Sequence, residues 1–561
     1  SGAKNVAIGN YALDACVSGD RSTAIGYASL SNSTGQYNTA VGYYSLLATT
    51  TGELNTAVGY AALEANTTGQ HNTAVGSDAL GGCTTGEKNV AIGRLSLGQC
   101  GADPDRCTGV GAYTLENNEA DNNTAVGTSA LNANTTGEQN VAVGSYALIA
   151  NTTGDFNTAS GYYALAANTT GDNNAAFGRG ALVNNVSSNN NSAFGDYALQ
   201  SNTAGNNSAF GYRTLYTNSS GTNNVAVGSN TLYKNTTGSS NTGIGQGALY
   251  ANTTASDNTA VGKGALNVNT TGSVNVAVGS YALDANTTGD KNVAVGKAAL
   301  TNNTTADNNI AVGYESLKLN TTGANNVAVG VNALTANTTG LQNTAIGNSA
   351  LESNTTGDNL VAIGIQALGN NTTANNNLAL GFQALYDNTT GTNNVALGYQ
   401  ALYENTSAEK NAAIGLQALY KNTTGEKNTA IGYAAGYTNE TSDHNTSVGH
   451  GASFYNTGHS NVSVGSEALL GSSSVTSTGE ENVAIGAYAL RTNQTGDHNT
   501  AVGRSAGFDI TSGNNNTLIG WGAGTNASPS GLISSTSNHV CIGDNNVASA
   551  HIKVDWTVTS D

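Results

Sequence analysis

The chain has 561 residues, of which 72 are Gly, 2 are Pro and none is Met, and only 10% are charged. An ordinary globular chain of this length divides into several domains, but this composition is neither globular nor typical of a disordered acidic chain. The formal net charge of −18 repels phosphate backbones, and no run of about 18 apolar residues occurs, so we expect no nucleic-acid binding and no membrane insertion.

One phrase recurs along the whole sequence, and residues 55–71, NTAVGYAALEANTTGQH, are a clean copy of it. We number its positions 1 to 17 from the first residue of the NTAVG-like pentad. The 32 pentads start between residues 5 and 539, and 24 of the 31 intervals are 17 residues long. Position 5 is Gly in every copy, position 4 is apolar in every copy except at Ser160, and position 9 is Leu in most. A short period of this kind indicates a repeat architecture.

The repeat predicts an all-β fold, because Asn, Thr, Gly and β-branched residues form helices poorly and no 3.6-residue stripe develops. We expect a parallel β-solenoid of 17-residue coils with two short strands in each coil. The pentad forms one strand and the segment around xxALxx forms the other. The invariant Gly and the NTTG segment form the corners. Stacked coils then place identical residues about 4.8 Å apart.

Only two large apolar residues occur in each coil, at positions 4 and 9, and in the clean copy they are Val58 and Leu63. We expect these two to form the core. The small residues at positions 3 and 8, here Ala57 and Ala62, indicate close approach to the opposite wall of the coil or to a neighbouring chain. So thin a core predicts an intertwined or side-by-side homotrimer, which would cover the exposed edges, in a rod roughly 150 Å long.

The cysteines test this register. Cys16, Cys83 and Cys100 all stand at position 12, and Cys83 and Cys100 are one period apart. Stacking places their Cα atoms roughly 5 Å from each other, so a Cys83–Cys100 disulfide is predicted. Cys107 competes as a partner for Cys100, and Cys541, at position 3, is expected to be a buried thiol.

Tyrosine is the surplus aromatic residue, with 25 copies against 7 of Phe. Position 10 is Tyr in two sets of three consecutive coils, which are Tyr216, Tyr233 and Tyr250, and Tyr386, Tyr403 and Tyr420. Such ladders are candidates for binding a glycan or a protein partner, although they are equally suited to packing on each other or lining a groove between chains.

No catalytic residue, cofactor site or metal site is predicted. The seven histidines show no metal-ligand spacing, and no phosphate-binding glycine motif occurs. Acidic residues recur at position 16, for example Glu53, Glu87, Glu138, Asp155, Asp172, Asp290 and Asp307. We interpret them as a solvated edge, with a cation site as the alternative.

We divide the chain into a regular solenoid over residues 1–435, an irregular continuation with longer loops over 436–543, and a tail over 544–561. In the irregular part Leu at position 9 gives way to Gly436, Ser453, Gly507 and Gly524. Its loops and Trp521 are candidates for specific recognition, and the alternative is tapering into a missing domain.

Two families resemble this sequence. The pentads NVAIG, NTAVG and NVAVG are similar to those of YadA-type trimeric adhesin heads, which are trimers of parallel β-rolls. Arrays such as NTAVGYAALEANTTG, and the variants NTAIGYAAG and NTLIGWGAG, resemble those of bacteriophage tail fibres and tailspikes. In many of these the array runs into a self-cleaving intramolecular chaperone that opens with Ser-Asp.

The terminal Ser560-Asp561 matches that opening, so the resemblance implies Ser560 as a candidate scission point before a missing chaperone domain, unless the chain simply stops there. Because the chain also opens inside a repeat, we expect it to be a fragment or a processed product.

These observations predict a non-enzymatic, homotrimeric shaft of a phage tail fibre. In that role it would lie outside the cell in the virion, joined to other tail proteins, and present an end that binds a host cell-surface glycan or protein. A bacterial surface adhesin or extracellular filament is the first alternative, and a polysaccharide-depolymerising tailspike is the second.

Overall fold

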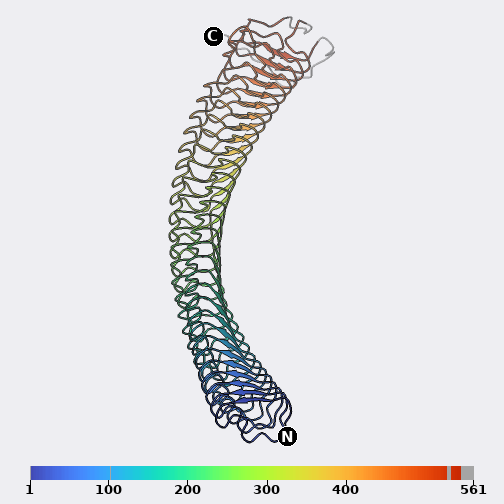
Figure 1. Ribbon diagram of the computed structural model, residues 1–561. Coiled ribbons are helices and arrows are strands. Elements are labelled where there is room, and N and C mark those ends of the chain that lie inside the picture. Colours follow the sequence, from blue (N-terminus) through green and yellow to red (C-terminus); the bar gives the residue numbers. More distant parts are fainter. Residues whose placement is uncertain (1, 102, 527–531, 545–561) are drawn as a thin grey trace, which may run out of the picture. The chain divides into compact units, whose positions relative to one another are not determined.

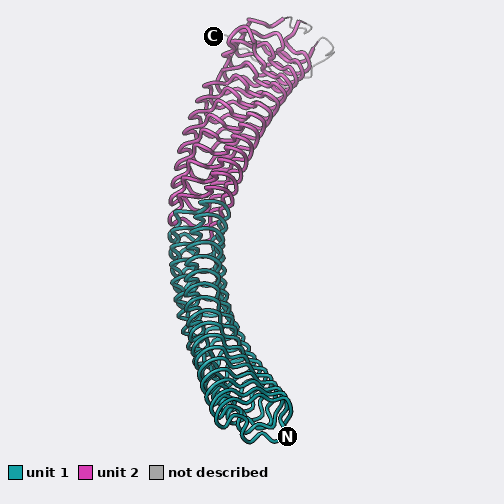
Figure 2. The backbone as a smooth tube through the Cα atoms, viewed as in Figure 1, with its two compact units in different colours: residues 1–290 teal, residues 291–561 magenta. Residues whose placement is uncertain are grey.

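The structure is a computed structural model that describes residues 2–101, 103–526 and 532–544. The chain divides into two compact units, residues 1–290 and residues 291–561, drawn in teal and magenta in Figure 2. Each unit is a stack of coils. Every regular element among the described residues is a strand of three residues at positions 2 to 4 of the repeat (Figure 1).

Unit 1 contains seventeen of these described strands: β1 (Val6–Ile8), β2 (Thr23–Ile25), β3 (Thr39–Val41), β4 (Thr56–Val58), β5 (Thr73–Val75), β6 (Val90–Ile92), β7 (Thr108–Val110), β8 (Thr124–Val126), β9 (Val141–Val143), β10 (Thr158–Ser160), β11 (Ala175–Phe177), β12 (Ser192–Phe194), β13 (Ser208–Phe210), β14 (Val225–Val227), β15 (Thr242–Ile244), β16 (Thr259–Val261) and β17 (Val276–Val278).

Unit 2 contains the other fifteen described strands: β18 (Val293–Val295), β19 (Ile310–Val312), β20 (Val327–Val329), β21 (Thr344–Ile346), β22 (Val361–Ile363), β23 (Leu378–Leu380), β24 (Val395–Leu397), β25 (Ala412–Ile414), β26 (Thr429–Ile431), β27 (Thr446–Val448), β28 (Val462–Val464), β29 (Val483–Ile485), β30 (Thr500–Val502), β31 (Thr517–Ile519) and β32 (Val540–Ile542).

Within each unit, every strand pairs in parallel with the strand of the next coil, and equal positions face each other. For example, β9 pairs with β10 with Val141 opposite Thr158, Ala142 opposite Ala159 and Val143 opposite Ser160. The register holds even where a coil is longer, as in the pairing of Val462 with Val483. The predicted parallel β-solenoid with a 17-residue coil is therefore confirmed.

The prediction of a second strand around xxALxx is wrong. That stretch is a series of turns, because positions 7 and 9 adopt the left-handed backbone conformation, as does position 17 at the end of the coil. In the coil of residues 140–156, φ is 62° at Tyr146, 51° at Leu148 and 57° at Phe156. This conformation costs about 1 to 2 kcal/mol for a residue with a side chain, so extended strand was the simpler expectation.

The left-handed residues direct their N–H groups to neighbouring coils. Tyr146 donates to the carbonyl oxygen of Thr128 at 2.9 Å, in the coil before, and Leu148 donates to that of Ala164 at 3.0 Å, in the coil after. Backbone hydrogen bonds between coils thus continue around the turns, and these bonds offset the conformational cost.

The invariant Gly at position 5 meets two requirements. At Gly144 φ is 131°, and a Cβ added there would lie 2.6 Å from the carbonyl oxygen of Gly161 in the next coil. A side chain is therefore excluded both by conformation and by the close approach of the stacked backbones.

Position 4 does not form the core, contrary to the sequence-based prediction. Successive strand residues point to opposite faces. In β9, Ala142 at position 3 is fully buried, whereas Val143 at position 4 is 41% exposed. The interior is formed by the small residues of positions 3 and 8 together with Leu at position 9, for example Leu148. The small residues therefore contact the opposite wall of their own coil. Of the two interpretations of positions 3 and 8, this one holds and contact with a neighbouring chain does not.

Buried asparagines complete the interior with two ladders of amides. At position 12, Asn151 Nδ2 donates to Asn134 Oδ1 of the preceding coil at 2.7 Å and to the Gly154 carbonyl at 3.0 Å. At position 1, Asn140 Nδ2 donates to the same Gly154 carbonyl at 2.8 Å, and its Oδ1 accepts the Asn157 N–H of the next coil at 2.9 Å. All these side chains are fully buried.

We predict that Asn151→Ala destabilises unit 1 by about 2 to 4 kcal/mol, because it leaves the buried Asn134 Oδ1 without a hydrogen-bond partner and removes one bond each from the Gly154 carbonyl and the Asn168 amide. Urea unfolding followed by circular dichroism measures the change. Thr153→Ala, at an exposed position of the same coil, is the matched control and should shift the midpoint little. Equal midpoints for the two variants would contradict a structural role for the amide ladder.

Candidate functional site

Each unit exposes a row of large apolar side chains on its strands. We call these position-4 side chains the outward apolar row. Their exposed fractions run from 36% to 58% at eighteen positions: Ile8, Val58, Val75, Ile92, Val126, Val143, Phe177, Phe210, Val227 and Ile244 in unit 1, and Ile346, Leu380, Leu397, Ile431, Ile485, Val502, Ile519 and Ile542 in unit 2. An apolar surface that is contiguous from coil to coil is typical of an interaction site.

Sequence reasoning missed this surface, although a signal was present. In a three-residue strand, positions 3 and 4 necessarily face opposite sides. Position 3 is small in nearly every copy, which a crowded interior requires and an exposed surface does not. That difference identifies position 3 as the inward residue and position 4 as the outward one.

The structure brings the predicted position-10 tyrosines together as two stacks. In the first tyrosine ladder, the ring centres of Tyr216 and Tyr233 are 5.1 Å apart and those of Tyr233 and Tyr250 are 5.3 Å apart. In the second tyrosine ladder, the corresponding distances are 5.5 Å for Tyr386 and Tyr403 and 5.1 Å for Tyr403 and Tyr420.

The second ladder is longer than the sequence analysis assigned. Tyr437 stacks on Tyr420 at 5.1 Å, and Phe454 stacks on Tyr437 at 4.7 Å. Burial, with a further contribution from Asp387 and Glu404, raises the pKa of Tyr403 above its ordinary value. The phenol is therefore a neutral hydrogen-bonding group over the physiological pH range.

Stacking limits what these ladders can bind. Consecutive rings cover each other's faces, with interplanar angles of 14° or less, so a ring inside a ladder offers a ligand its edge and hydroxyl group. Only the ring at the end of a ladder has a face without an aromatic neighbour at the same position of the next coil. A sugar ring that stacks on tyrosine needs such an end.

Further rows with the same origin were not predicted. Tyr27, Tyr43 and Tyr60 stack at position 6, and Phe177, Phe194 and Phe210 stack at position 4. At position 7, glutamines form an amide ladder in which Gln383 donates to Gln366 at 3.0 Å. Any side chain that repeats at one position becomes a ladder, because coils stack in register.

Trp521, the other predicted recognition residue, stands at position 6 directly after β31 and is 56% exposed. The candidate scission residue Ser560 and the predicted tail beyond Asp544 lie outside the described residues.

The disulfide expected from the register is present, and Cys83 and Cys100 have a Cα–Cα distance of 4.9 Å. It replaces one rung of the position-12 amide ladder, and Asn66 Oδ1 in the preceding coil consequently has no hydrogen-bond partner. Cys107 is a buried thiol beside the Ala120 carbonyl, so the alternative pairing with Cys100 does not form. Cys541 is buried, with 5% exposure.

Aspartates at position 16 bind backbone groups of the neighbouring coil. Asp155 Oδ1 accepts the N–H of Glu138 at 2.8 Å, Asp172 Oδ1 accepts that of Asp155 at 2.9 Å, and Asp290 Oδ1 accepts that of Ser273 at 2.7 Å. Asn375 at position 16 accepts the N–H of Asp358 in the same way, so this position requires a side-chain oxygen acceptor and does not require a charge. Nowhere in the described ranges do three His, Cys, Asp or Glu side chains gather in a way that would hold a metal ion.

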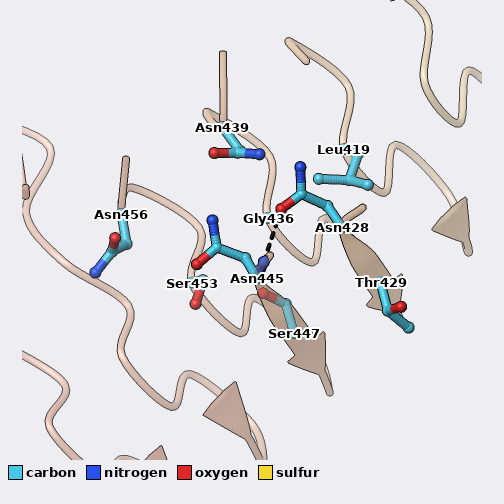
Figure 3. A pocket seen from close by; sticks show the side chains of 9 residues that line it. All are labelled: Leu419, Asn428, Thr429, Gly436, Asn439, Asn445, Ser447, Ser453 and Asn456. Carbon is cyan, nitrogen blue, oxygen red and sulfur yellow. Dashed lines mark hydrogen bonds between the residues drawn. The ribbon is translucent and has the colours of Figure 1, made fainter. Parts of the chain in front are cut away.

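A small interior cavity of about 10 Å³ lies in unit 2 where position 9 lacks its leucine, at Gly436 and Ser453 (Figure 3). Asn445 donates its N–H to Asn428 Oδ1 there at 2.8 Å. Asn439 Oδ1 and Asn456 Nδ2 have no protein partner. The volume suits one water molecule and excludes an organic ligand.

No family model matches this sequence, and no curated protein matches it either. Among the described residues there is no helix long and apolar enough to cross a membrane.

We predict that the native protein at pH 8 is alkylated by iodoacetamide at Cys16 and is protected at Cys107. Burial raises the pKa of the Cys107 thiol to about 11, so the reactive thiolate forms only well above pH 8, whereas Cys16 is partly exposed. Intact-mass measurement should find one label per chain, because Cys541 is also buried.

Reduction in denaturant should raise the number of labels to five, and Cys16→Ser should abolish native labelling. Two or more labels on the native wild-type chain would contradict the burial of Cys107 and Cys541.

Proposed function

We propose that this chain is the non-enzymatic shaft of a homotrimeric bacteriophage tail fibre that attaches the virion to a host cell surface. The observation that carries the proposal is the outward apolar row, which repeats once per coil in both units except at Ser160. Monomeric soluble proteins rarely leave such a surface uncovered.

The spacing of the row favours a second copy of the same chain as its partner. Coils stack at about 4.8 Å, so a partner that covers the row along a unit has to present apolar groups with the same repeat. Another copy of this solenoid meets that condition at every coil but the one with Ser160. Contact between large outward residues takes the place of the alternative in which positions 3 and 8 approach a neighbouring chain, because those positions are buried inside the coil.

The number three and the assignment to a phage rest on resemblance. The pentads are similar to those of trimeric adhesin heads, and the longer arrays are similar to those of tail fibres. The absence of an enzymatic role is supported by the position-16 carboxylates, since those of Asp155, Asp172 and Asp290 are engaged by backbone N–H groups of the stack. The irregular coils after residue 435 and Trp521 supply candidate recognition surfaces.

We predict a solution mass of three times the chain mass of 56.2 kDa by sedimentation equilibrium. Val143→Lys combined with Val227→Lys should shift the mass toward that of one chain, because it places charges in the apolar contact. The control is Thr153→Lys combined with Thr237→Lys, which adds the same charges to exposed sites of the same two coils. A monomeric wild-type protein, or equal effects of the two double substitutions on the mass, would contradict the proposed trimer.

Attachment is tested separately. The purified chain should cosediment with at least some strains of a bacterial panel, and it should leave their isolated surface polysaccharides at their original length on chromatography. Shortening of the polysaccharide would identify a depolymerising tailspike. Antibody labelling in the electron microscope should mark phage tails, whereas labelling of the bacterial envelope would identify an adhesin.

A further inference from the structure

The end of the first tyrosine ladder borders an open notch in unit 1. Tyr250 has one face on Tyr233, and the next coil carries Asn267 at position 10 instead of an aromatic residue. A hollow of about 270 Å³ lies at this end, and its lining includes Asn230, Gln246, Gly247, Tyr250, Lys263 and Tyr281.

The notch exists because position 7 is Gly in two consecutive coils. At Gly264 the ring of Tyr281 fills the space, since an added Cβ would lie 2.8 Å from its Cδ1. At Gly247 an added Cβ would meet only Asn267 Oδ1, at 3.7 Å. Most other coils carry a side chain at this position. Gly247 is therefore the residue whose missing side chain opens the notch.

The lining combines aromatic rings, amides and positive charge. Tyr250 and Tyr281 offer ring surfaces to the C–H face of a sugar, and Asn230 and Gln246 offer donors and acceptors to its hydroxyl groups. The Lys263 ammonium lies 5.8 Å from the ring centre of Tyr281, and that of Lys234 lies 5.4 Å from that of Tyr250.

Neither lysine is in a salt bridge with a described residue, so both are available to an anion. The acidic residue Asp284 lies beside Gly264, since a Cβ added at Gly264 would be 3.8 Å from Asp284 Oδ1. Its carboxyl group is hydrogen-bonded with Asn267, and burial raises its pKa above the ordinary value.

We propose that this notch binds one carboxylate-bearing pyranose, such as a hexuronate or sialate unit of a cell-surface glycan, with its ring against Tyr250 and its carboxylate at Lys263. This assignment rests on the proposed attachment function and names the receptor chemistry for it. The size of the notch suits a single sugar ring, and longer glycans would extend along the surface of neighbouring coils.

The test is calorimetric titration of the whole protein with trigalacturonate, with its methyl ester and with sialyllactose. Binding of at least one of the two acidic sugars is expected, and the methyl ester, which keeps the ring and loses the charge, should bind at least ten-fold more weakly than trigalacturonate. Which acid binds distinguishes the two sources of the carboxylate. No binding of either acid, or binding of trigalacturonate that its methyl ester matches in affinity, would overturn the proposal.

Gly247→Gln should weaken binding at least ten-fold, because it fills the notch. It should keep the fold, since glutamine occupies position 7 at Gln366 and Gln383 with φ of 57° and 51°, close to the 67° of Gly247. Lys263→Gln should weaken binding of the acid about ten-fold and leave the weak binding of the ester unchanged. Lys88→Gln, elsewhere in unit 1, is the control and should have no effect.

If the Gly247→Gln variant still binds the acidic sugar as tightly, the sugar binds at another site and the assignment to the notch is overturned. Failure of this inference is distinguishable from failure of the proposed function, because cosedimentation with bacteria is measured independently. If the protein binds cells but binds no acidic sugar, only the proposed sugar site in the notch is refuted.

Discussion

The carbonyl oxygen of position 15 accepts two buried amides, one from each asparagine ladder, and this junction recurs along both units. In the coil of residues 140–156 it is Gly154, bound by Asn140 and Asn151. Each asparagine also binds a neighbouring coil, so the same junction closes the cross-section of a coil and sets its register with the next. A buried amide without these partners is costly, and a shifted stack would break the junctions it crosses.

The junction leaves little room inside the coil. Two asparagines and Leu at position 9 occupy most of the interior, so positions 3 and 8 are small, and the large apolar residues of position 4 lie outside. The apolar surface that supports the proposed trimer is thus a consequence of a polar interior. The tyrosine ladders have the same origin, since strict register turns any repeated side chain into a stack. The proposed binding notch lies where this repetition fails, at Gly247.

Much of this arrangement could be predicted from period and composition. The in-register stack was predicted, and so were the proximity of Cys83 and Cys100 and the alignment of the tyrosines. The turns that replace the predicted second strand could not be predicted. Leu rarely adopts a φ near 50°, and only hydrogen bonds to both neighbouring coils make that conformation favourable. The notch was also beyond prediction, since the space at Gly264 is filled by Tyr281 and that at Gly247 is not.

The sequence by itself determined the repeat, its parallel stacking and the rows of identical side chains, because a fixed period aligns equal positions whatever the shape of the coil. Small side chains at position 3 indicated one inward row, and the tertiary structure decided the inward set as a whole. That choice depends on the local conformation at positions 5, 7, 9 and 17 and on how two amides meet one carbonyl, and these are properties of a closed coil with neighbours above and below it. Hydrophobicity alone assigned Val58 to the core, whereas the alternation of a three-residue strand leaves it exposed at 36%.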